Sequence, residues 1–477
     1  MVSPLWPWCI CFGRLVGFNS SDDLFAGNTV VDRGVFRLIA GGVSFMAMNA
    51  RFLKSACVLC AGLLGVTLVG PSPSATGQQT SYSLPSADPE EVGLSKERLA
   101  RLDGMLQTMV DERELAGVVA LLARHGKVAF VDVAGVQDIE SNRPMTRDSI
   151  FRIFSMTKPI TGVAMMMLYE EGRWRLNDPV SRYIPEFETL RVYAGENSDG
   201  SIQEEKLDRP ITMRELMTHT AGLSYTLDMR HSVNRMFRDQ RVLNSREPLQ
   251  AMIDKMAMLP LLAQPGTRWI YSSSVDVQGY LVEKLSGQKF ADFLKERIFD
   301  PLGMADTAFY VPTENTSRLA LRHSVGADGN LMLDSRGEPF TETPPGPSGG
   351  GGLFGTADDY LRFTQMLLNG GELDGVRLLA PRTVEMMRTN HMSAEATRNM
   401  RPGMGFGMDF MIYMDPAAAG EPNSPGSYYW LGIDGTWFWI DPASDLVVVG
   451  MIQNRGGSTN GDIRALSRSL VYGALTQ

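Results

Sequence analysis

Apolar residues recur at helical spacing close to the start of the region that looks folded. Between Leu94 and Glu114 they return every three or four positions, at Leu99, Leu102, Met105, Leu106 and Met109. This spacing places them on one face of an α-helix, and Ser95 in front of them is a suitable N-cap. The pattern predicts an amphipathic helix that begins just after Ser95.

Two pairs of apolar runs predict β-hairpins, one near each end of this region. The first pair covers residues 117–135 and flanks His125-Gly126, and the second covers residues 435–453 and flanks a turn with Pro442. Short apolar, β-branched runs on both sides of a turn are typical of hairpins. Because sequence-adjacent strands usually pair and crossings are rare, we expect both hairpins to share one antiparallel sheet.

The middle of the chain, about residues 155–300, is mainly helix-forming with loops, and residues 461–475 predict a final helix. Strands at both ends around a helical middle argue against an alternating βαβ fold. The predicted class is α+β, an antiparallel sheet flanked by helices with a large, mainly helical lobe. We assign residues 91–477 to this domain and the polar, proline-containing residues 78–90 to a linker.

The first 77 residues have a different character. Residues 48–54 are short and basic, residues 55–70 are apolar, and residues 71–77 are small or proline. This order is typical of a secretory signal peptide, and the apolar run is shorter than the roughly 20 residues of a spanning helix. We predict a signal peptide over residues 46–77 and a secreted or periplasmic product without stable membrane insertion after processing. Residues 1–45 would then be an upstream extension from a misassigned start codon; a membrane-anchored N-terminus is the alternative.

Composition excludes several classes of function. The formal charge is −9, and the +2 balance of residues 1–77 leaves −11 for the rest, without a Lys/Arg cluster, so nucleic acid is not an expected partner. All four cysteines lie at or before residue 60, which removes a thiol nucleophile from the domain. The five histidines show no HExxH pattern, so we expect neither a metal nor another cofactor.

Ser155 and Lys158 are the first candidates for catalysis. Residues 161–173 are helix-forming and Pro159 is tolerated in a first helical turn, so Ser155 should lie at a helix N-terminus with Lys158 on the same face. A serine hydroxyl needs a neighbouring base, and a buried lysine amine can supply one. An N-cap serine beside an exposed lysine would give the same tetrapeptide.

Tyr271 and Ser273 follow a Pro-Gly turn within residues 264–276. A tyrosine near the lysine could take the serine proton and later protonate the leaving group, and Ser273 could hydrogen-bond the substrate or Lys158. The alternative is a core aromatic residue next to a polar turn.

Trp430, Gly432 and Gly435 lead into the C-terminal hairpin. Small residues at a strand edge let a substrate approach the backbone, and an N–H near Gly435 could complete an oxyanion hole with the N–H of Ser155. A strand with a glycine bulge is the alternative.

In this order and at these separations, the three motifs resemble the serine β-lactamase, penicillin-binding-protein and esterase superfamily. They are most similar to its class C β-lactamase-like esterases, the family VIII carboxylesterases. Residues 216–223, LMTHTAGL, resemble that family's L-x-T-H-T-S-G-L signature, and residues 350–360 resemble its glycine-rich stretch before a helix. The resemblance spans about residues 85–475.

The resemblance implies that Ser155 is the acylated nucleophile, Lys158 its partner and Tyr271 the tyrosine of Y-x-N/S, with Ser273 in the third place. Trp430 stands where β-lactamases and transpeptidases carry the lysine of K-T-G and these esterases have W-G-G or H-x-G. Loss of that lysine removes a cation for the carboxylate of β-lactams, which favours neutral esters. Leu431 replaces a Gly or Thr and puts a bulky side chain beside the substrate edge.

Three other features are assigned no catalytic role. Residues 346–350 match G-x-S-x-G around Ser348 but lack the strand before and the helix after that such a serine needs. Glu170 and Glu171 lack the accompanying S-D-N pattern of class A β-lactamases and are expected at a solvated helix end. His219 is expected to brace a loop.

The predicted function is hydrolysis of small, short-acyl carboxylic esters through an acyl-enzyme. Three alternatives remain: a β-lactamase or D-alanyl-D-alanine carboxypeptidase, an amidase or acyltransferase on the same fold, and a catalytically idle binding protein. In each enzymatic case the partner is a small ester or amide.

Overall fold

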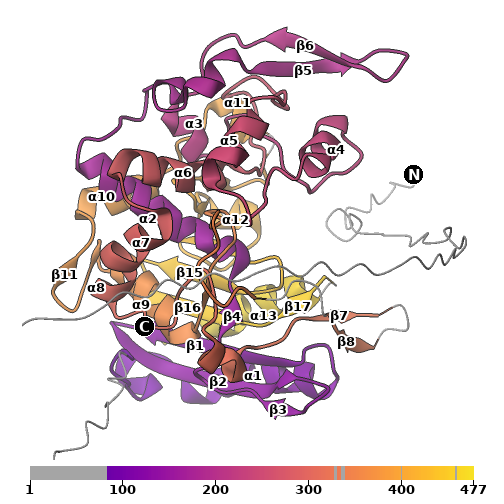
Figure 1. Cartoon of the computed structure of the whole chain (residues 1–477). Coiled ribbons are helices and arrows are strands. Elements are labelled where there is room, and N and C mark those ends of the chain that lie inside the picture. The colour runs from indigo at the N-terminus through magenta and orange to yellow at the C-terminus, as the bar shows by residue number, and fades with distance from the viewer. Residues whose placement is uncertain (1–82, 327–329, 335–338, 399, 457–458, 477) are drawn as a thin grey trace, which may run out of the picture. The chain divides into compact units, whose positions relative to one another are not determined.

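The computed structural model describes residues 83–326, 330–334, 339–398, 400–456 and 459–476, and among these an antiparallel sheet of eight strands organises the fold (Figure 1). The strand order β12-β13-β14-β15-β16-β1-β2-β3 brings strands from both ends of the domain together. The strands are β1 Gly117–Arg124, β2 Lys127–Asp138, β3 Arg143–Pro144, β12 Met404–Phe406, β13 Met411–Tyr413, β14 Tyr428–Leu431, β15 Trp437–Asp441 and β16 Leu446–Met451.

The two predicted hairpins share this sheet, because β1 pairs with both β2 and β16. Alternate residues of β1 enter different cores: Val118, Ala120 and Leu122 join one, and Val119, Leu121 and Ala123 join the other. A strand covered on both faces reads as a continuous apolar run rather than an alternating one. The predicted α+β class, an antiparallel sheet flanked by helices, is confirmed.

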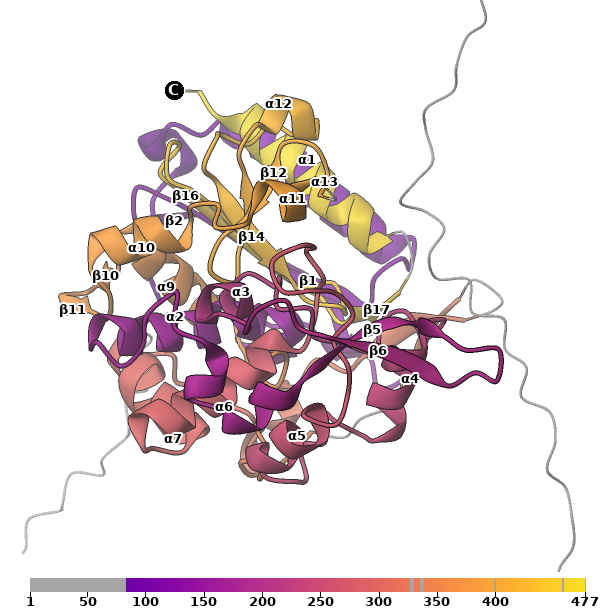
Figure 2. The same cartoon turned by 90° about the horizontal axis from the view of Figure 1, so that it is seen from above.

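Helices cover both faces of the sheet. Helices α1 (Lys96–Asp111) and α13 (Thr459–Ala474) pack side by side on one face, as Figure 2 shows, and α9 (Ala357–Leu368) packs on β1 and β16 from the other. The Ser95 side chain accepts a hydrogen bond from Arg98 N–H at 3.3 Å. Both the predicted N-cap and the two terminal helices are therefore present.

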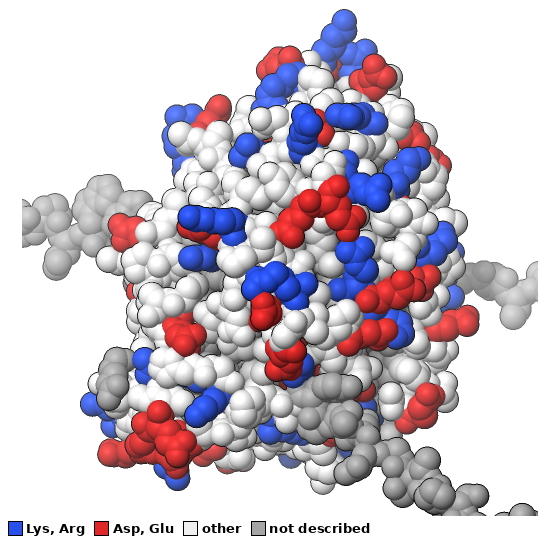
Figure 3. Space-filling model, turned by 90° about the vertical axis from the view of Figure 1, so that its left-hand side faces the viewer, with Lys and Arg blue, Asp and Glu red and all other residues white. Residues whose placement is uncertain are grey.

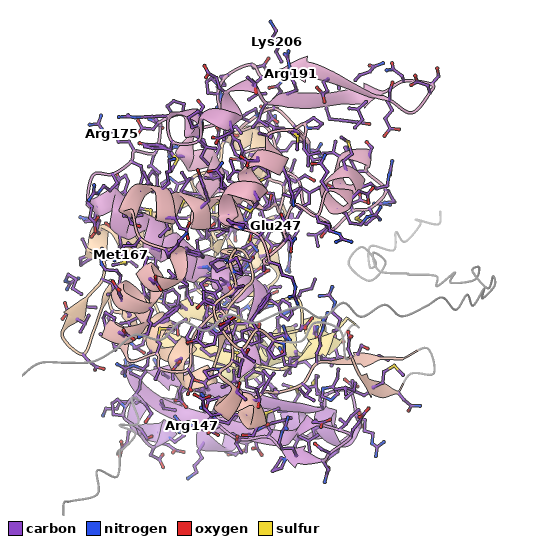
Figure 4. All side chains as sticks on the ribbon, viewed as in Figure 1. Arg147, Met167, Arg175, Arg191, Lys206 and Glu247 are labelled. Atoms are coloured by element: carbon purple, nitrogen blue, oxygen red, sulfur yellow. The ribbon has the colours of Figure 1, made fainter. Side chains whose placement is uncertain are left out.

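The helical lobe lies between the two hairpins in sequence. Its helices are α2 (Thr157–Glu170), α3 (Met213–Met217), α4 (Ser232–Asp239), α5 (Leu249–Met256), α6 (Ser274–Ser286), α7 (Phe290–Leu294) and α8 (Asp300–Leu302). It also contains a hairpin of β5 (Arg191–Glu196) and β6 (Ile202–Lys206), which the hydrophobic pattern did not predict, because β6 buries no residue and so shows no apolar alternation. Arg191 and Lys206, labelled in Figure 4, are register partners at the start of this hairpin.

Short elements connect these parts. Strand β4 (Phe151–Arg152) pairs with β9 (Phe354–Gly355), which joins the chain before Ser155 to the end of the glycine-rich stretch. The others are β7 His323–Val325, β8 Leu331–Leu333, β10 Glu372–Leu373, β11 Val376–Arg377, β17 Asn454–Arg455, α10 Pro381–Met387, α11 Ala394–Thr397, α12 Pro416–Ala419, the 3₁₀ helices Pro89–Val92, Phe154–Met156, Val180–Arg182, Pro185–Thr189 and Thr313–Arg318, and a π-helical turn Lys295–Phe299.

The segment assigned to a linker, residues 78–90, is described from Ser83 onward. There Leu84 is buried, Ala87 N–H donates to Val128 O at 3.0 Å, and Val128 N–H donates to Pro85 O at 2.8 Å. This stretch is thus held against β2. The predicted extension (residues 1–45) and signal peptide (residues 46–77) lie outside the described residues, in which no helix is long and apolar enough to span a membrane.

Acidic and basic side chains are interspersed on the face shown in Figure 3. Ion pairs such as Lys295–Asp300 at 2.6 Å and Arg297–Glu171 at 2.8 Å join elements on this side of the molecule. Exposed pairs of this kind contribute about 0–1 kcal/mol each, so the stability of the fold depends on its two apolar cores.

Gly450 tests how tightly the sheet packs under α1 and α13. It lies opposite Trp437, and a Cβ built on it would come within 2.1 Å of the indole ring. We expect Gly450→Ala to lower the free energy of unfolding by about 1–3 kcal/mol through overpacking, measured by urea unfolding. Gly104→Ala is the matched control: nothing lies within 4 Å of its Cβ in mid-α1, so it should stabilise by about 0.5–1 kcal/mol. Equal effects of the two substitutions would contradict the packing argument.

Candidate functional site

Ser155 lies in the 3₁₀ turn Phe154–Met156 directly before α2. Phe154 has a φ of 43°, at the point where the chain passes from β4 into α2. A residue with a side chain rarely adopts this conformation, and such strain persists where surrounding contacts over-determine the backbone, as they often do at functional sites. Ser155 thus stands at the N-terminus of α2, as the sequence predicted.

The Lys158 side chain returns along α2 to Ser155. Its Nζ donates to Ser155 Oγ at 3.3 Å and to the carbonyl oxygen of Gly350 at 2.6 Å. The lysine has no exposed surface, and a buried amine of this kind requires hydrogen-bond partners to offset its lost hydration. The alternative of an exposed lysine beside an N-cap serine is therefore excluded.

Tyr271 joins this pair from 116 residues further along the chain. Its hydroxyl donates to Ser155 Oγ at 2.6 Å. Lys158 Nζ lies 4.7 Å from the centroid of the Tyr271 ring. The hydroxyl, amine and phenol that the sequence analysis singled out thus meet at one point.

A buried carboxylate holds the glycine-rich stretch beside Lys158. Asp276 on α6 accepts hydrogen bonds from Gly350 N–H at 3.0 Å and from the Ser348 hydroxyl at 2.5 Å. A Cβ on Gly350 would lie 2.5 Å from Asp276 Oδ2, so this approach requires glycine. Because the Gly350 carbonyl accepts a hydrogen bond from Lys158 Nζ, Asp276 positions the lysine through Gly350.

Two buried carboxyl groups, Asp276 and Asp409, interact with this lysine. Asp409 is buried as well and accepts a hydrogen bond from Gln278 at 3.2 Å. Burial raises the pKa of Asp276, and the Lys158 cation acts against that rise. Burial also raises the pKa of Asp409 well above its usual value, with Gln278 and Lys158 opposing. Lys158 and the two carboxyl groups therefore form one coupled electrostatic unit next to Ser155.

Aromatic rings pack around Tyr271. The ring centroids of His219, Trp269 and Trp430 lie 5.1, 6.2 and 5.5 Å from its own. His219 is fully buried, and its Nδ1 accepts the Ser272 N–H at 3.2 Å. Burial lowers the pKa of His219 well below its usual value, to which the Lys158 cation adds. The neutral ring braces the segment that carries Tyr271, in keeping with the expected bracing role.

Ser273 does not take the place expected of it. Its hydroxyl donates to the Ser224 carbonyl at 2.9 Å and its N–H donates to the same oxygen at 3.1 Å. In the described structure no hydrogen bond joins it to Lys158. It is fully buried and ties the start of α6 to the loop after residues 216–223; its contact with a substrate stays a prediction.

The turn after β14 lies next to the nucleophile segment. A Cβ on Gly432 would come within 2.8 Å of the Ile153 carbonyl, two residues before Ser155. The Gly432 N–H donates to Thr436 O at 2.7 Å, and the Gly435 N–H donates to Gly432 O at 3.1 Å. Both N–H groups are used within the turn, so neither is free for an oxyanion.

The N–H of Ile433 is different. It donates to no group among the described residues, and the same holds for the N–H of Ser155. Of the backbone N–H groups in this turn, we therefore regard that of Ile433, directly after Gly432, as the candidate for the oxyanion donor expected near Gly435.

The features set aside in the sequence lie away from Ser155 or support it indirectly. Glu170 accepts the Ala380 N–H at 2.8 Å and Glu171 pairs with Arg297 at 2.8 Å. Both stand at the far end of the 14-residue α2, about 20 Å from its start at about 1.5 Å per residue.

The described residues contain no group of three His, Cys, Asp or Glu side chains that could hold a metal ion.

Comparison with known proteins identifies the family. The model of the family described as Beta-lactamase matches residues 102–472. The chain belongs to the beta-lactamase family. Esterase EstB of Burkholderia gladioli is 32% identical over 407 residues, which cover 81% of this chain and 98% of EstB. The predicted resemblance to β-lactamase-like esterases is thereby confirmed.

Two further relatives agree with this placement. Protein Rv1367c of Mycobacterium tuberculosis (strain ATCC 25618 / H37Rv) is 36% identical over 366 residues, covering 74% of this chain and 90% of that protein. The solved structure of "EstCE1, a hydrolase with promiscuous acyltransferase activity" matches with a TM-score of 0.67 and 29% identity, covering 79% of this chain and 99% of that one. This member of the beta-lactamase family is a serine hydrolase.

Sequence reasoning missed Asp276 and Ile433. Asp276 lies five residues after Tyr271 in a segment that was singled out, but the sequence does not show that its carboxylate meets the glycine-rich stretch 74 residues later. The feature of interest at Ile433 is its backbone N–H, of which the identity of the side chain gives no sign.

Asp276→Asn tests the positioning of Lys158. A neutral amide makes weaker hydrogen bonds to Ser348 and Gly350 than a carboxylate does, so we expect kcat for a short ester to fall about three- to tenfold, with a smaller change in KM. Asp441→Asn is the matched control, since this buried carboxylate accepts N–H groups of Ala443 and Ser444 in the β15–β16 turn. Its kcat per folded molecule should stay at the wild-type value. If Asp276→Asn changed kcat as little as Asp441→Asn does, the positioning role of Asp276 would be contradicted.

Proposed function

We propose that this serine hydrolase cleaves small, short-acyl carboxylic esters through an acyl-enzyme on Ser155. The observation that carries the proposal is the pair of contacts at Ser155 Oγ, 2.6 Å to the Tyr271 hydroxyl and 3.3 Å to Lys158 Nζ. A nucleophile and its bases within hydrogen-bond reach are the geometric requirement for covalent catalysis.

In acylation, Ser155 Oγ forms a bond to the ester carbonyl carbon and its hydroxyl proton passes to Tyr271 or Lys158. The carbon–oxygen bond to the alcohol then breaks, and the same proton goes to the departing alkoxide. In deacylation a water molecule attacks the acyl carbon, gives a proton to the same pair, and Ser155 regains it as the acid leaves. The two steps are the reverse of each other in their proton movements.

The negative oxygen of each tetrahedral intermediate needs donors. We assign this role to the N–H groups of Ser155 and Ile433, because both are without a partner among the described residues and the turn of Ile433 touches Ile153. Removing one such donor typically costs about 2.7–4 kcal/mol of transition-state stabilisation.

Trp430 argues against β-lactams and D-alanyl-D-alanine peptides as main substrates. Its ring packs at 5.5 Å from both Tyr271 and Phe406 and is 6% exposed. An apolar, buried indole at the strand edge supplies no cation there for a substrate carboxylate. The intact contacts of Ser155 argue equally against an idle binding protein.

The choice of nucleophile is tested with Ser155→Ala, which should lower kcat/KM for p-nitrophenyl acetate at least about a thousandfold. Ser348→Ala is the control, because Ser348 is the other serine with a hydrolase-like motif. It loses one hydrogen bond to Asp276, so its activity should fall by no more than about tenfold. Mass spectrometry after brief exposure to the ester should find the acetyl adduct on Ser155. An adduct on Ser348, or full activity of Ser155→Ala, would overturn the proposal.

Acyl transfer is the second candidate, and the likeness to EstCE1, a hydrolase with promiscuous acyltransferase activity, supports it. An alcohol can take the place of water in deacylation, because the oxygen atom of either molecule can attack the acyl carbon of the acyl-enzyme. With a primary alcohol added to a p-nitrophenyl ester, we expect chromatography to show a transfer ester whose share of product rises with alcohol concentration. Free acid as the sole product at every alcohol concentration would restrict the enzyme to hydrolysis.

A further inference from the structure

A cavity of about 250 Å³ adjoins the catalytic group on its Tyr271 side. It lies between the segment leading into α4 and the segment before α6, and Tyr225 and Tyr271 form part of its wall. Tyr271 touches Ser155, and Lys158 Nζ lies 5.6 Å from the Tyr225 ring centroid. Sites for drug-sized ligands usually measure about 300–1,000 Å³, so this cavity suits one arm of an ester rather than a whole large molecule.

Two polar residues of the cavity wall, Asp228 and Asn234, already have hydrogen-bond partners within the protein. Asp228 accepts hydrogen bonds from Arg230 Nε at 2.8 Å and Nη2 at 3.0 Å. Asn234 accepts the Ser224 hydroxyl at 2.6 Å and donates to the Asp228 carbonyl at 2.8 Å. The Asp228 charge is thus balanced by Arg230 within its own loop, and Asn234 holds that loop in place.

Two other residues of the wall, Arg268 and His231, have side-chain N–H groups that make no hydrogen bond to the described residues. Arg268 lines the cavity, is exposed, and makes no ion pair or hydrogen bond with any residue in the part of the chain that the structure describes. His231 Nδ1 accepts the Val233 N–H at 3.3 Å, so the neutral ring carries its proton on Nε2. Burial lowers the pKa of His231, which keeps the ring in that neutral form at pH 7.

We propose that this cavity binds a carboxylate carried by one arm of the ester, with Arg268 as its cation and His231 as a second donor. This inference rests on the proposed ester hydrolysis and adds a substrate class to it. A guanidinium presents paired N–H groups that match a carboxylate. Trp430, which packs on Tyr271, supplies no cation, whereas Arg268 supplies one in the cavity that Tyr271 also lines.

The experiment compares matched pairs of esters by kcat/KM. One pair carries the charge on the leaving group, 4-acetoxybenzoate against 4-acetoxybenzamide. The other carries it on the acyl group, 4-nitrophenyl hydrogen adipate against 4-nitrophenyl methyl adipate. For at least one pair, Arg268→Gln should lower the ratio of charged to neutral kcat/KM about three- to tenfold, Arg268→Glu should lower it further, and Arg268→Lys should retain part of it. The pair that responds identifies which ester arm enters the cavity.

Each ratio is internal to one protein sample, so partial misfolding of a variant does not affect it. Arg382→Gln is the control for net charge: Arg382 lies on α10, on the opposite side of the molecule from α4 in Figures 1 and 2, and its side chain is exposed. It should leave both ratios unchanged. Ratios that stay at the wild-type value in Arg268→Gln would overturn this inference while Ser155-dependent turnover left the proposed function intact. A wild-type enzyme that cleaves none of these esters would overturn both.

Discussion

The placement of one buried amine governs the geometry of the whole site. Lys158 has no exposed surface, and the described structure offers its Nζ hydrogen bonds to Ser155 Oγ and to the Gly350 carbonyl. An amine removed from water is stable only with such partners, so every segment that supplies one is constrained. Asp276 holds Gly350, Gly350 holds Lys158, and Lys158 faces Ser155. This chain of contacts runs from α6 through the glycine-rich stretch to α2. A shift in any of these three segments would therefore move Lys158 Nζ relative to Ser155 Oγ.

The sheet lobe fixes the other side of the nucleophile. Strand β4 pairs with β9 just before Ser155 and just after the glycine-rich stretch, and the turn after β14 approaches Ile153 too closely for any residue but glycine at position 432. Ser155 is therefore clamped between elements that come from both lobes. Phe154 keeps a φ of 43° next to a well-held residue: the Ile153 N–H donates to Leu353 O at 3.1 Å, and the Ile153 carbonyl accepts the Met156 N–H at 3.0 Å. Rigid support of this kind is what a short-range proton transfer requires.

Much of this arrangement follows from local patterns in the sequence. The helix after Ser95, the two hairpins and the shared sheet were predictable because apolar periodicity reports directly on burial, and Ser155, Lys158 and Tyr271 were predictable because their motifs stand in a family-specific order. The β5–β6 hairpin was not, since its polar, exposed strands bury little. The hydrogen bond of Ser273 to the Ser224 carbonyl was not predictable either, because a hydroxyl in a motif does not reveal which group it donates to. Backbone donors such as Ile433 and long-range partners such as Asp276 depend on how distant loops close, which single-sequence patterns do not encode.

The site also separates the chemistry from the choice of substrate. Lys158 comes from α2, Ser155 from the 3₁₀ turn directly before it, and Tyr271 from the segment that His219 braces. Trp430 and Arg268 make no hydrogen bond to Ser155 among the described residues: Trp430 packs on the Tyr271 ring, and Arg268 lines the cavity beside Tyr271. The buried Trp430 indole packs on Tyr271, and the exposed Arg268 lines the cavity for which we propose a carboxylate. In the proposed carboxylate site, an ester with an anionic arm would gain a charge-assisted hydrogen bond from Arg268. A carboxylate turned toward the Trp430 indole would instead lie without a cation, at a cost on the order of several kcal/mol, so the proposed site would favour one orientation of such an ester over the other.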